Sequence, residues 1–337
     1  MQAVPVTVVE EAKNWQQVLA EAVRDGNELL RVLQLENTAL ATQLGGENGF
    51  PVLVPRTFLS LMQLGDEHDP LLRQVLGLAE EDRPMPGYVT DPLDEQSANV
   101  RPGVVHKYHG RVLLIAAGGC AVNCRYCFRR HFPYAENRVG RKQWQEALAY
   151  VAADESISEV ILSGGDPLLL DDAALGQLCQ QIADIPHVRR LRIHSRVPVV
   201  IAQRITEQLV ELLAASRLQA SLVLHINHPN EISGELALRL DNMRKQGITL
   251  LNQTVLLKDV NDDPAVLCQL SQDLFAAGVL PYYLHRLDWV QGAHHFALSQ
   301  ERISELYRHM KEHLPGYLVP KLVCEEAGQP HKTLLMV

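Results

Sequence analysis

The sequence predicts an α/β protein built on a full or partial βα barrel, with a mainly helical extension in front of it. From Arg111 onward, short apolar runs alternate with longer amphipathic ones. Six such units follow one another, a pattern typical of a parallel sheet with helical crossovers. Polar motifs recur where the apolar runs end. In a barrel these ends are the carboxyl ends of the strands, where the chemistry takes place.

The N-terminal region, residues 1–100, differs from the rest of the chain. Between residues 10 and 44, apolar side chains recur near a helical period, at Leu19, Val23, Leu29, Leu30 and Leu33. From Gly65 to Gly103 the chain is rich in Pro, Asp and Glu, which favours extended connecting segments. We therefore expect a mainly helical region that covers a second domain, the barrel of residues 101–337.

The barrel domain supplies the strand–helix units in order. Its expected strands are 112–117, 159–163, 190–195, 221–227, 250–257 and 280–286. Its expected helices are 141–154, 171–184, 200–215, 234–246, 263–277 and 300–313. The apolar run at 318–324 is consistent with one further strand.

Composition excludes several classes of protein. The chain has 337 residues and a net charge of −9, which argues against a basic face that grips nucleic acid. Its first residues lack the pattern of a signal peptide, and no apolar stretch approaches the ~18 residues of a membrane span. We therefore expect a cytoplasmic protein without nucleic-acid or membrane partners. In the reducing cytosol, clustered cysteines indicate metal or redox chemistry.

Three of the six cysteines, Cys120, Cys124 and Cys127, lie close together directly after the first barrel strand. A structural zinc site and an ordinary iron–sulfur cluster both need four ligands. The other three cysteines are isolated in the sequence. Three interpretations remain: three incidental small residues, a zinc site completed by a distant histidine, or a [4Fe–4S] cluster whose fourth iron is open to a small molecule.

The cysteine motif resembles that of the radical S-adenosylmethionine (SAM) enzymes, in which an aromatic residue, here Tyr126, precedes the third cysteine. The motif SGGDP follows the next strand and resembles the family's SAM-binding glycine motif, with Gly164, Gly165 and Asp166. Glycines at such a turn let the backbone approach a ligand closely. The resemblance implies a partial (βα)6-type barrel, a [4Fe–4S] cluster and SAM.

A closer resemblance is to the lysine 2,3-aminomutases, and it covers about residues 100–332. The matching segments occur in the family's order: HKYHGRVLLI (106–115), CAVNCRYCFRRHF (120–132), ILSGGDPLLL (161–170), RIHSRVPVV (192–200), HINHPNE (225–231), NQTVLLKDVND (252–262) and PYYLHRLD (281–288). This family uses pyridoxal phosphate (PLP) together with SAM. The resemblance implies migration of the amino group of L-lysine from C2 to C3.

The resemblance also implies roles for residues around PLP and SAM. An ungapped alignment places the family's PLP lysine on Lys332. Tyr108 and Arg111 match residues that contact PLP in the family. Four residues at the ends of barrel strands are further candidates for SAM contacts: His225, Asn227, His228 and Gln253.

Three residues match positions that bind the substrate in the family. Arg129 matches the arginine that holds the substrate carboxylate, and a guanidinium suits a carboxylate because it can donate two parallel hydrogen bonds. Asp288 matches one of two carboxylates that hold the distal ammonium group. The other matches Glu325, where the family has Asp. Together these charges would select lysine by its length.

The sequence resembles most closely the compact family members that supply (R)-β-lysine for modification of elongation factor P. This implies free L-lysine as substrate, an external electron donor, and a functional link to the factor and its lysyl-ligase. The chain ends at Val337, ahead of the cysteine-containing segment with which longer relatives bind zinc and assemble, so the oligomeric state stays open.

Three alternatives would differ in their cofactors or substrate. A glutamate aminomutase would share the barrel, but Asp288 and Glu325 would repel an acidic side chain. A zinc-binding protein would show neither colour nor PLP absorbance. A radical SAM activase of another protein would lack the PLP lysine.

Overall fold

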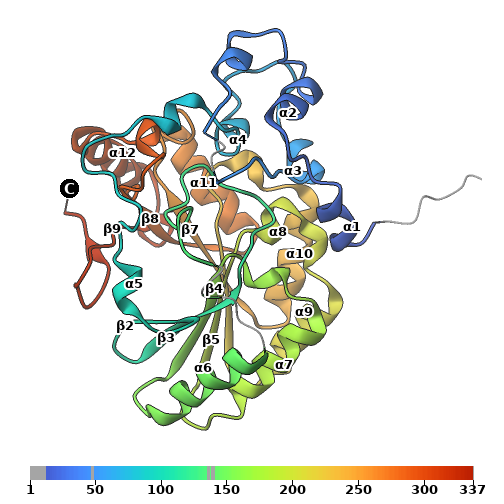
Figure 1. Cartoon of the computed structure of the whole chain (residues 1–337), viewed down its shortest axis with the longest axis vertical. Coiled ribbons are helices and arrows are strands. Elements are labelled where there is room, and N and C mark those ends of the chain that lie inside the picture. The colour runs from blue at the N-terminus through green and yellow to red at the C-terminus, as the bar shows by residue number, and fades with distance from the viewer. Residues whose placement is uncertain (1–12, 47–48, 135–136, 138–140, 337) are drawn as a thin grey trace, which may run out of the picture.

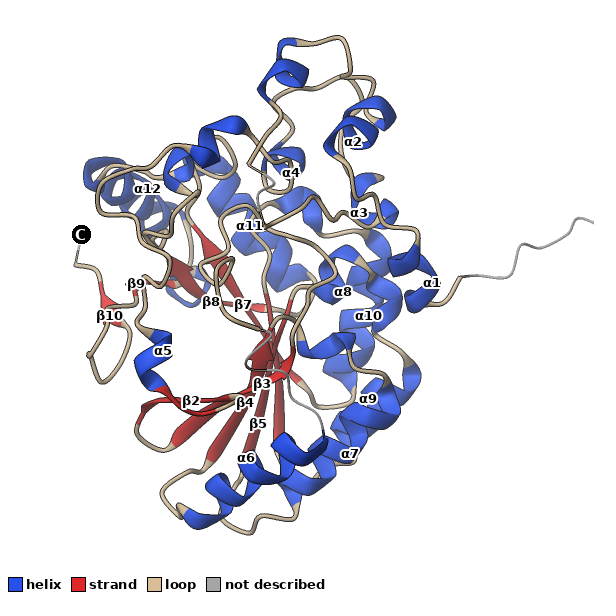
Figure 2. Ribbon diagram, viewed as in Figure 1, coloured by secondary structure: helices blue, strands red, loops and turns tan. Residues whose placement is uncertain are grey.

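The computed structural model describes residues 13–46, 49–134, 137 and 141–336, and its centre is one mixed sheet (Figures 1 and 2). The strands lie in the sheet in their chain order, from β1 to β10. Neighbours from β3 to β9 are parallel: β3 (Arg111–Ala117), β4 (Glu159–Gly164), β5 (Arg190–Ser195), β6 (Gln219–Leu224), β7 (Thr249–Val255), β8 (Leu280–His285) and β9 (Lys321–Cys324).

Antiparallel strands extend both edges of this parallel sheet. β1 (Asn99–Arg101) and β2 (Val104–Tyr108) form a hairpin beside β3, and β10 (Thr333–Leu334) pairs with β9. In the described part of the chain β1 and β10 are not paired with each other, so the barrel stays open along one seam. The predicted fold class, a partial βα barrel with a helical N-terminal region, is confirmed.

Helices connect the parallel strands and cover the outer face of the sheet (Figure 2). They are α6 (Arg141–Ala153), α7 (Asp172–Ala183), α8 (Val197–Val200), α9 (Glu207–Ala214), α10 (Gly234–Lys245), α11 (Pro264–Ala276) and α12 (Gln300–His313). A side chain caps the amino end of most of the longer ones; the Asp263 carboxylate, for example, accepts hydrogen bonds from the amides of Ala265 and Val266. No helix of the described residues is long and apolar enough to cross a membrane.

The prediction of one helix over 200–215 is wrong. The chain instead forms α8, then the 3₁₀ turn η4 (Ala202–Arg204), and only then α9. Thr206 causes the restart, because its hydroxyl accepts the backbone N–H of Leu209 and so begins a new helix.

Alternation along the strands separates the core from the interior of the barrel. In β5, Leu191 and Ile193 are buried in the main apolar core, whereas the intervening Arg192 and His194 line an internal cavity. β4 repeats this pattern, with Leu162 in the core and Ser163 facing the cavity. Because successive side chains of a strand point to opposite faces, one strand both anchors the helices and presents polar groups inward. Each fully buried leucine contributes roughly 2 kcal/mol.

The described part of the N-terminal region forms short helices rather than one long one. They are α1 (Trp15–Ala20), α2 (Gly26–Val32), the 3₁₀ turns η1 (Ala39–Gln43) and η2 (Ala79–Asp82), α3 (Arg56–Leu59), α4 (Pro70–Arg73) and α5 (Glu95–Ala98). Caps at Asn14 and Asp25 begin α1 and α2 separately. The expectation of extended segments at 65–103 missed α4, η2, α5 and the β1–β2 hairpin.

The apolar side chains of this region pack into the same core as the barrel. Leu30 and Phe58 belong to one continuous cluster with Leu168 and Leu191 of the barrel. Thr57 also donates its hydroxyl hydrogen to the carbonyl of Val200 in α8. The described N-terminal helices therefore share their apolar core with the barrel and pack against α8, which follows the carboxyl end of β5.

Candidate active site

A cavity of about 920 Å³ occupies the interior of the open barrel. Its wall contains all the residues that the sequence assigned to the cluster, PLP and substrate, together with the assigned glycine motif: Cys120, Cys124, Cys127, Gly164, Gly165, Asp166, Tyr108, Arg111, Arg129, Gln253, Asp288, Glu325 and Lys332. Of the additional candidates, His225 lines the cavity, whereas Asn227 and His228 do not. Residues far apart in sequence thus meet in one space.

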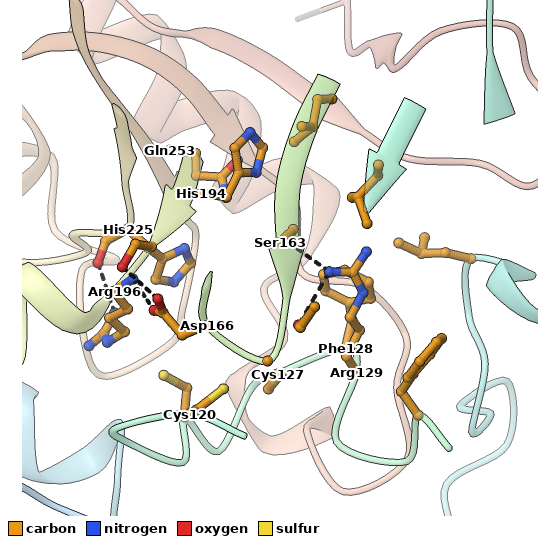
Figure 3. A pocket seen from close by; sticks show the side chains of 18 of the residues that line it. Cys120, Cys127, Phe128, Arg129, Ser163, Asp166, His194, Arg196, His225 and Gln253 are labelled. Atoms are coloured by element: carbon orange, nitrogen blue, oxygen red, sulfur yellow. Dashed lines mark hydrogen bonds between the residues drawn. The ribbon is translucent and has the colours of Figure 1, made fainter. Parts of the chain in front are cut away.

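The three clustered cysteines lie on the loop after β3 and line the cavity. Figure 3 shows two of them, Cys120 and Cys127. Burial and the charge of the neighbouring Cys124 raise the pKa of Cys127 to about 11. Burial also raises the pKa of Cys120. No group of His, Cys, Asp or Glu in the described part of the chain has the arrangement of a single-ion site. Three gathered thiols without a fourth form a donor set that suits a multinuclear cluster with one open position.

Arg125, between the second and third cysteines, fastens this loop to the N-terminal region. Its guanidinium is fully buried and donates to both carboxylate oxygens of Glu81, over 2.8 and 2.6 Å. It also donates to the carbonyl oxygens of Phe50 and Gly46. A buried charge needs such complete pairing. Sequence reasoning missed this residue because its partners lie more than forty positions away.

Tyr126 fastens the same loop to the neighbouring strand ends. Its hydroxyl accepts hydrogen bonds from Arg196 Nη1 and Asn227 Nδ2, each over 2.7 Å, and lies 2.9 Å from His225 Nε2. It also donates to the side-chain oxygen of Gln74 from the N-terminal region. Asn227, a candidate for SAM, is therefore engaged in holding the loop.

The SGGDP turn packs directly against the cysteine loop. Gly165 leaves no room for a side chain, because a Cβ atom there would collide with the backbone of Gly119. The amide of Asp166 donates to the carbonyl of Gly119 over 2.7 Å. Gly164 has a φ of 115°, a conformation that only glycine adopts easily. The close approach of two glycine backbones explains these residue types.

The Asp166 carboxylate has its own partners. It accepts hydrogen bonds from the Ser195 hydroxyl and from the amides of Leu168, Arg196 and Val197, over 2.7 to 3.1 Å. These bonds join the end of β4 to the end of β5. The Asp166 carboxylate thus holds the backbone at the ends of β4 and β5 in place. Its oxygens are occupied by these four hydrogen bonds.

Arg129, two residues after Cys127, reaches across the cavity to β4. Its Nη1 donates to the Ser163 hydroxyl over 3.0 Å (Figure 3). On its other edge, Nε and Nη2 donate to the two carboxylate oxygens of Glu95, over 2.6 and 2.7 Å. Sequence reasoning did not identify Glu95, which comes from α5 in the N-terminal region.

At the other side of the cavity, Glu325 lies between two lysines. Lys332 Nζ is 2.5 Å from one of its carboxylate oxygens, and Lys107 Nζ is 3.1 Å from the other. Burial alone would raise the pKa of the Glu325 carboxyl, but the two ammonium groups hold it well below its usual range. The ammonium group of Lys332 therefore lies beside Glu325. The sequence resemblance assigns this carboxylate to the distal ammonium group of the substrate.

Asp288 is the least compensated carboxyl of the cavity. Its side chain makes no hydrogen bond or ion pair with another described residue. Burial raises its pKa to about 7, although the nearby Lys332 acts to lower it. A cationic ligand would favour its ionised form. The Asp288 carboxyl is thus suited to bind an ammonium group.

Arg111 and Tyr108 form a small cationic surface near the edge of the sheet. The Arg111 guanidinium lies over the Tyr108 ring, 4.6 Å from its centroid. No carboxylate of the described residues pairs with Arg111. A cation in the cavity wall without an anionic partner is suited to receive a phosphate.

Two histidines of the cavity wall belong to polar motifs at strand ends but received no role from the sequence. The Nε2 atoms of His194 and His285 are buried without a hydrogen-bond partner in the described part of the chain. Burial and the nearby Lys332 lower the pKa of His285 to about 3, so its ring is neutral. Their positions follow from strand alternation, since His194 is two residues after Arg192 and His285 two residues after Tyr283.

The seam of the barrel passes along this side of the cavity. Figure 2 shows α5 between the β2 edge and the β9–β10 edge. The ion pair between Lys107 of β2 and Glu325, directly after β9, connects the two edges. Lys107 also donates to the carbonyl of Leu93, just before α5. Side chains therefore join edges that no backbone ladder joins in the described chain.

Comparison with known proteins identifies chains that are related to this one in sequence. Residues 114–267 match the model of the radical SAM superfamily. The chain is 52% identical over 324 residues to the L-lysine 2,3-aminomutase of Escherichia coli (strain K12), covering 96% of this chain and 94% of that protein. It is 49% identical over 327 residues to the L-lysine 2,3-aminomutase of Haemophilus influenzae, covering 97% of each.

More distant relatives are longer. The L-lysine 2,3-aminomutase of Clostridium subterminale is 35% identical over 280 residues, which cover 83% of this chain and 67% of that protein. Among solved structures, a Streptococcus suis protein bound to S-adenosylmethionine matches with a TM-score of 0.46 and 13% identity, covering 65% of this chain and 51% of that chain. At this score the likeness carries no argument, and the sequence matches decide the relationship.

Proposed function

The chain belongs to the lysine 2,3-aminomutase family of radical SAM enzymes, which are isomerases, and from this premise we propose that it converts (S)-α-lysine into (R)-β-lysine. The observation that carries the proposal is the composition of one cavity. Its wall combines the cysteine loop, an arginine for a carboxylate, two carboxylates for an ammonium group, and Lys332.

Cys120, Cys124 and Cys127 would hold a [4Fe–4S] cluster, and the adjacent Gly164–Gly165 backbone would contact SAM. The donor set fits, since three thiols line the cavity while no fourth ligand joins them among the described residues. When bound, the cluster with SAM supplies a 5′-deoxyadenosyl radical, and PLP supplies the conjugated ring that carries the migrating nitrogen. Formation of this radical consumes one electron, which an external donor would first supply to the cluster.

Lys332 would carry PLP, and Arg111 with Tyr108 would bind its phosphate. These residues fit the cofactor because Arg111 presents an uncompensated positive charge to the cavity. Lys332 reaches the same cavity from the segment between β9 and β10. With Lys332 bound to the cofactor, Glu325 would keep Lys107 as its partner, and its other carboxylate oxygen would be available to the distal ammonium group.

The substrate would lie between Arg129 and the pair Asp288–Glu325. The guanidinium would hold the α-carboxylate, and the two carboxyls would hold the distal ammonium group. L-Lysine carries both charges at opposite ends, whereas L-glutamate would bring a negative charge to two carboxyls. The wall charges thus favour lysine and disfavour an acidic amino acid.

The cavity would also limit the access of water to reactive species. Orientation is the main contribution expected of the protein here, because the reacting groups must stay in fixed, close positions. Arg129 lies near the start of the barrel domain's sequence and Lys332 near its end, and both line the cavity. Separate elements would therefore hold the substrate, through Arg129, and the cofactor, through Lys332. Exclusion of water limits side reactions of the radical.

Because the chain resembles compact family members, we extend the proposal: it would act in the cytoplasm and supply β-lysine for a later modification step. The β-lysine would be the substrate of a ligase that attaches it to elongation factor P. In cells that lack this chain, mass spectrometry of the factor should show loss of the β-lysyl group, and supplied (R)-β-lysine should restore it. An unchanged factor would contradict this extension without affecting the aminomutase proposal.

The direct test is anaerobic reconstitution with iron, sulfide and PLP, followed by SAM, reductant and L-lysine. Chiral chromatography should show β-lysine, and reactions without SAM or with L-glutamate should show no β-amino acid. A protein that carries both cluster and PLP but forms no β-lysine would refute the substrate assignment.

A further inference from the structure

Glu95 brings the N-terminal region into the active site. It lies on α5, is 4% exposed, and lines the cavity. The Asp91 carboxylate accepts hydrogen bonds from the backbone amides of Glu95 and Gln96, each over 3.0 Å. These two bonds fix the start of this short helix. The backbone of Glu95 is therefore held in place by its own segment, independently of Arg129.

The contact between Glu95 and Arg129 occupies one particular edge of the guanidinium. A guanidinium can bind a carboxylate through its Nε/Nη2 edge or through its Nη1/Nη2 edge. Glu95 takes the Nε/Nη2 edge with both oxygens. On the remaining edge, Nη1 contacts Ser163 and the carbonyl of Gly164, both at the cavity. Glu95 thus holds one edge, Nη1 has further partners in the cavity wall, and Nη2 keeps one N–H for which the described residues supply no acceptor.

We propose that Glu95 is a positioning residue that orients Arg129 for recognition of the substrate carboxylate, an inference that rests on the proposed function. Arg129 and Glu95 together carry no net charge, so this pair attracts a carboxylate less strongly than a lone arginine would. What Glu95 provides is direction, because a two-fold hydrogen bond fixes the plane of the guanidinium.

The same carboxylate connects the two ends of the substrate space. Lys107 Nζ lies 3.7 Å from Glu95 and 3.1 Å from Glu325, and Glu325 in turn contacts Lys332. Charges therefore alternate from Arg129 to Lys332 along the cavity wall. This row of contacts joins the group proposed for the α-carboxylate to the group proposed for the distal ammonium.

Glu95→Gln tests the proposal because positioning and simple neutralisation predict opposite results. The amide keeps the size of the side chain but loses one acceptor and the charge. If Glu95 orients Arg129, L-lysine should bind about tenfold or more weakly. If Glu95 merely neutralises Arg129, or occupies the place of the substrate, L-lysine should bind more tightly, which would overturn the proposal.

The measurement is calorimetric titration of PLP-loaded, cluster-containing protein without reductant, so that no turnover occurs. Cadaverine, which is lysine without its carboxylate, is the second probe. Glu95→Gln should weaken lysine binding and leave cadaverine binding unchanged. Equal weakening of both ligands would show a general structural role and overturn the proposal. In an Arg129→Gln background, Glu95→Gln should cause no further loss for lysine.

Two controls separate folding and function from positioning. Asp172→Asn breaks a similar contact to the buried Arg204 outside the cavity wall and should leave the preference for lysine over cadaverine unchanged. If Glu95→Gln fails to fold, Glu95→Asp replaces it in the test. This variant keeps the charge but shortens the side chain, and its affinity for lysine should be lower than that of the wild type. An Asp variant that binds lysine as tightly as the wild type would contradict the positioning role. If the wild type itself does not prefer lysine to cadaverine, the proposed function falls as well.

Discussion

Replacing Asp288 with Asn should remove a pH dependence from the stability of the cofactor-free protein. Burial raises the pKa of this carboxyl from 3.8 to about 7. Between these two values the folded chain holds a proton that the unfolded chain releases. Stability therefore falls as the pH rises through this window, because ionisation of Asp288 is less favourable in the folded state. Asn has no proton to release, so the variant lacks this effect.

The size of the effect follows from the shift. A displacement of about 3 pKa units, at ~1.4 kcal/mol per unit, corresponds to about 4 kcal/mol once the pH exceeds both values. About 2.5 kcal/mol of this loss falls between roughly pH 5 and pH 8. The free energy of unfolding of the wild type, relative to Asp288→Asn, should decrease by that amount over this interval.

Urea denaturation of the cofactor-free wild type and variant across this pH range checks the prediction. Two curves that run parallel with pH would refute the reasoning, since they would show that the carboxyl has an ordinary pKa in the folded protein. A second arm uses the PLP-loaded proteins. There, Asp288→Asn should weaken L-lysine binding, because an ionised carboxylate is lost opposite the distal ammonium.

Three further substitutions test the cofactor site, the glycine contact and the core. Lys332→Ala should abolish the PLP label that borohydride fixes to the wild-type chain; a label that persists on another residue, found by peptide mapping, would contradict the assignment. Gly165→Ala should lower SAM binding at least about tenfold, measured by equilibrium dialysis, because its Cβ forces the turn away from Gly119; unchanged binding would show that this contact is not needed. Leu191→Ala, at a fully buried core position, should cost about 3 kcal/mol in urea denaturation, whereas Leu238→Ala, 76% exposed, should change stability little; equal costs would contradict the described packing.

Much of the barrel could be predicted because its signals are local. Alternating apolar runs identified all the parallel strands, and the ends of most elements lay within a few residues of the prediction. The failures also have local causes. Caps at Asn14, Asp25 and Thr206 restart helices that periodicity alone would continue. Short strands such as β10 carry too few residues to show a period.

The site was predictable where a residue belongs to a motif, and less so where its role depends on a distant partner. Arg129 and Lys332 could be located by their order along the chain. Glu95 could not, because nothing in its surroundings in the sequence indicates that it meets an arginine 34 positions later. Arg125 and Glu81 form a similar pair across 44 positions. Such pairs become visible only when the N-terminal region packs on the cysteine loop.

The open seam of the barrel has a mechanical consequence. A barrel closed by backbone hydrogen bonds would have to break a ladder before its interior could widen. Here the Lys107–Glu325 ion pair and the α5 helix connect the two edges, so widening of the interior would separate side-chain contacts without breaking a backbone ladder. This pair is largely buried, and salt screens buried ion pairs little. The charged side chains of the active site therefore also hold the two edges of the barrel wall together.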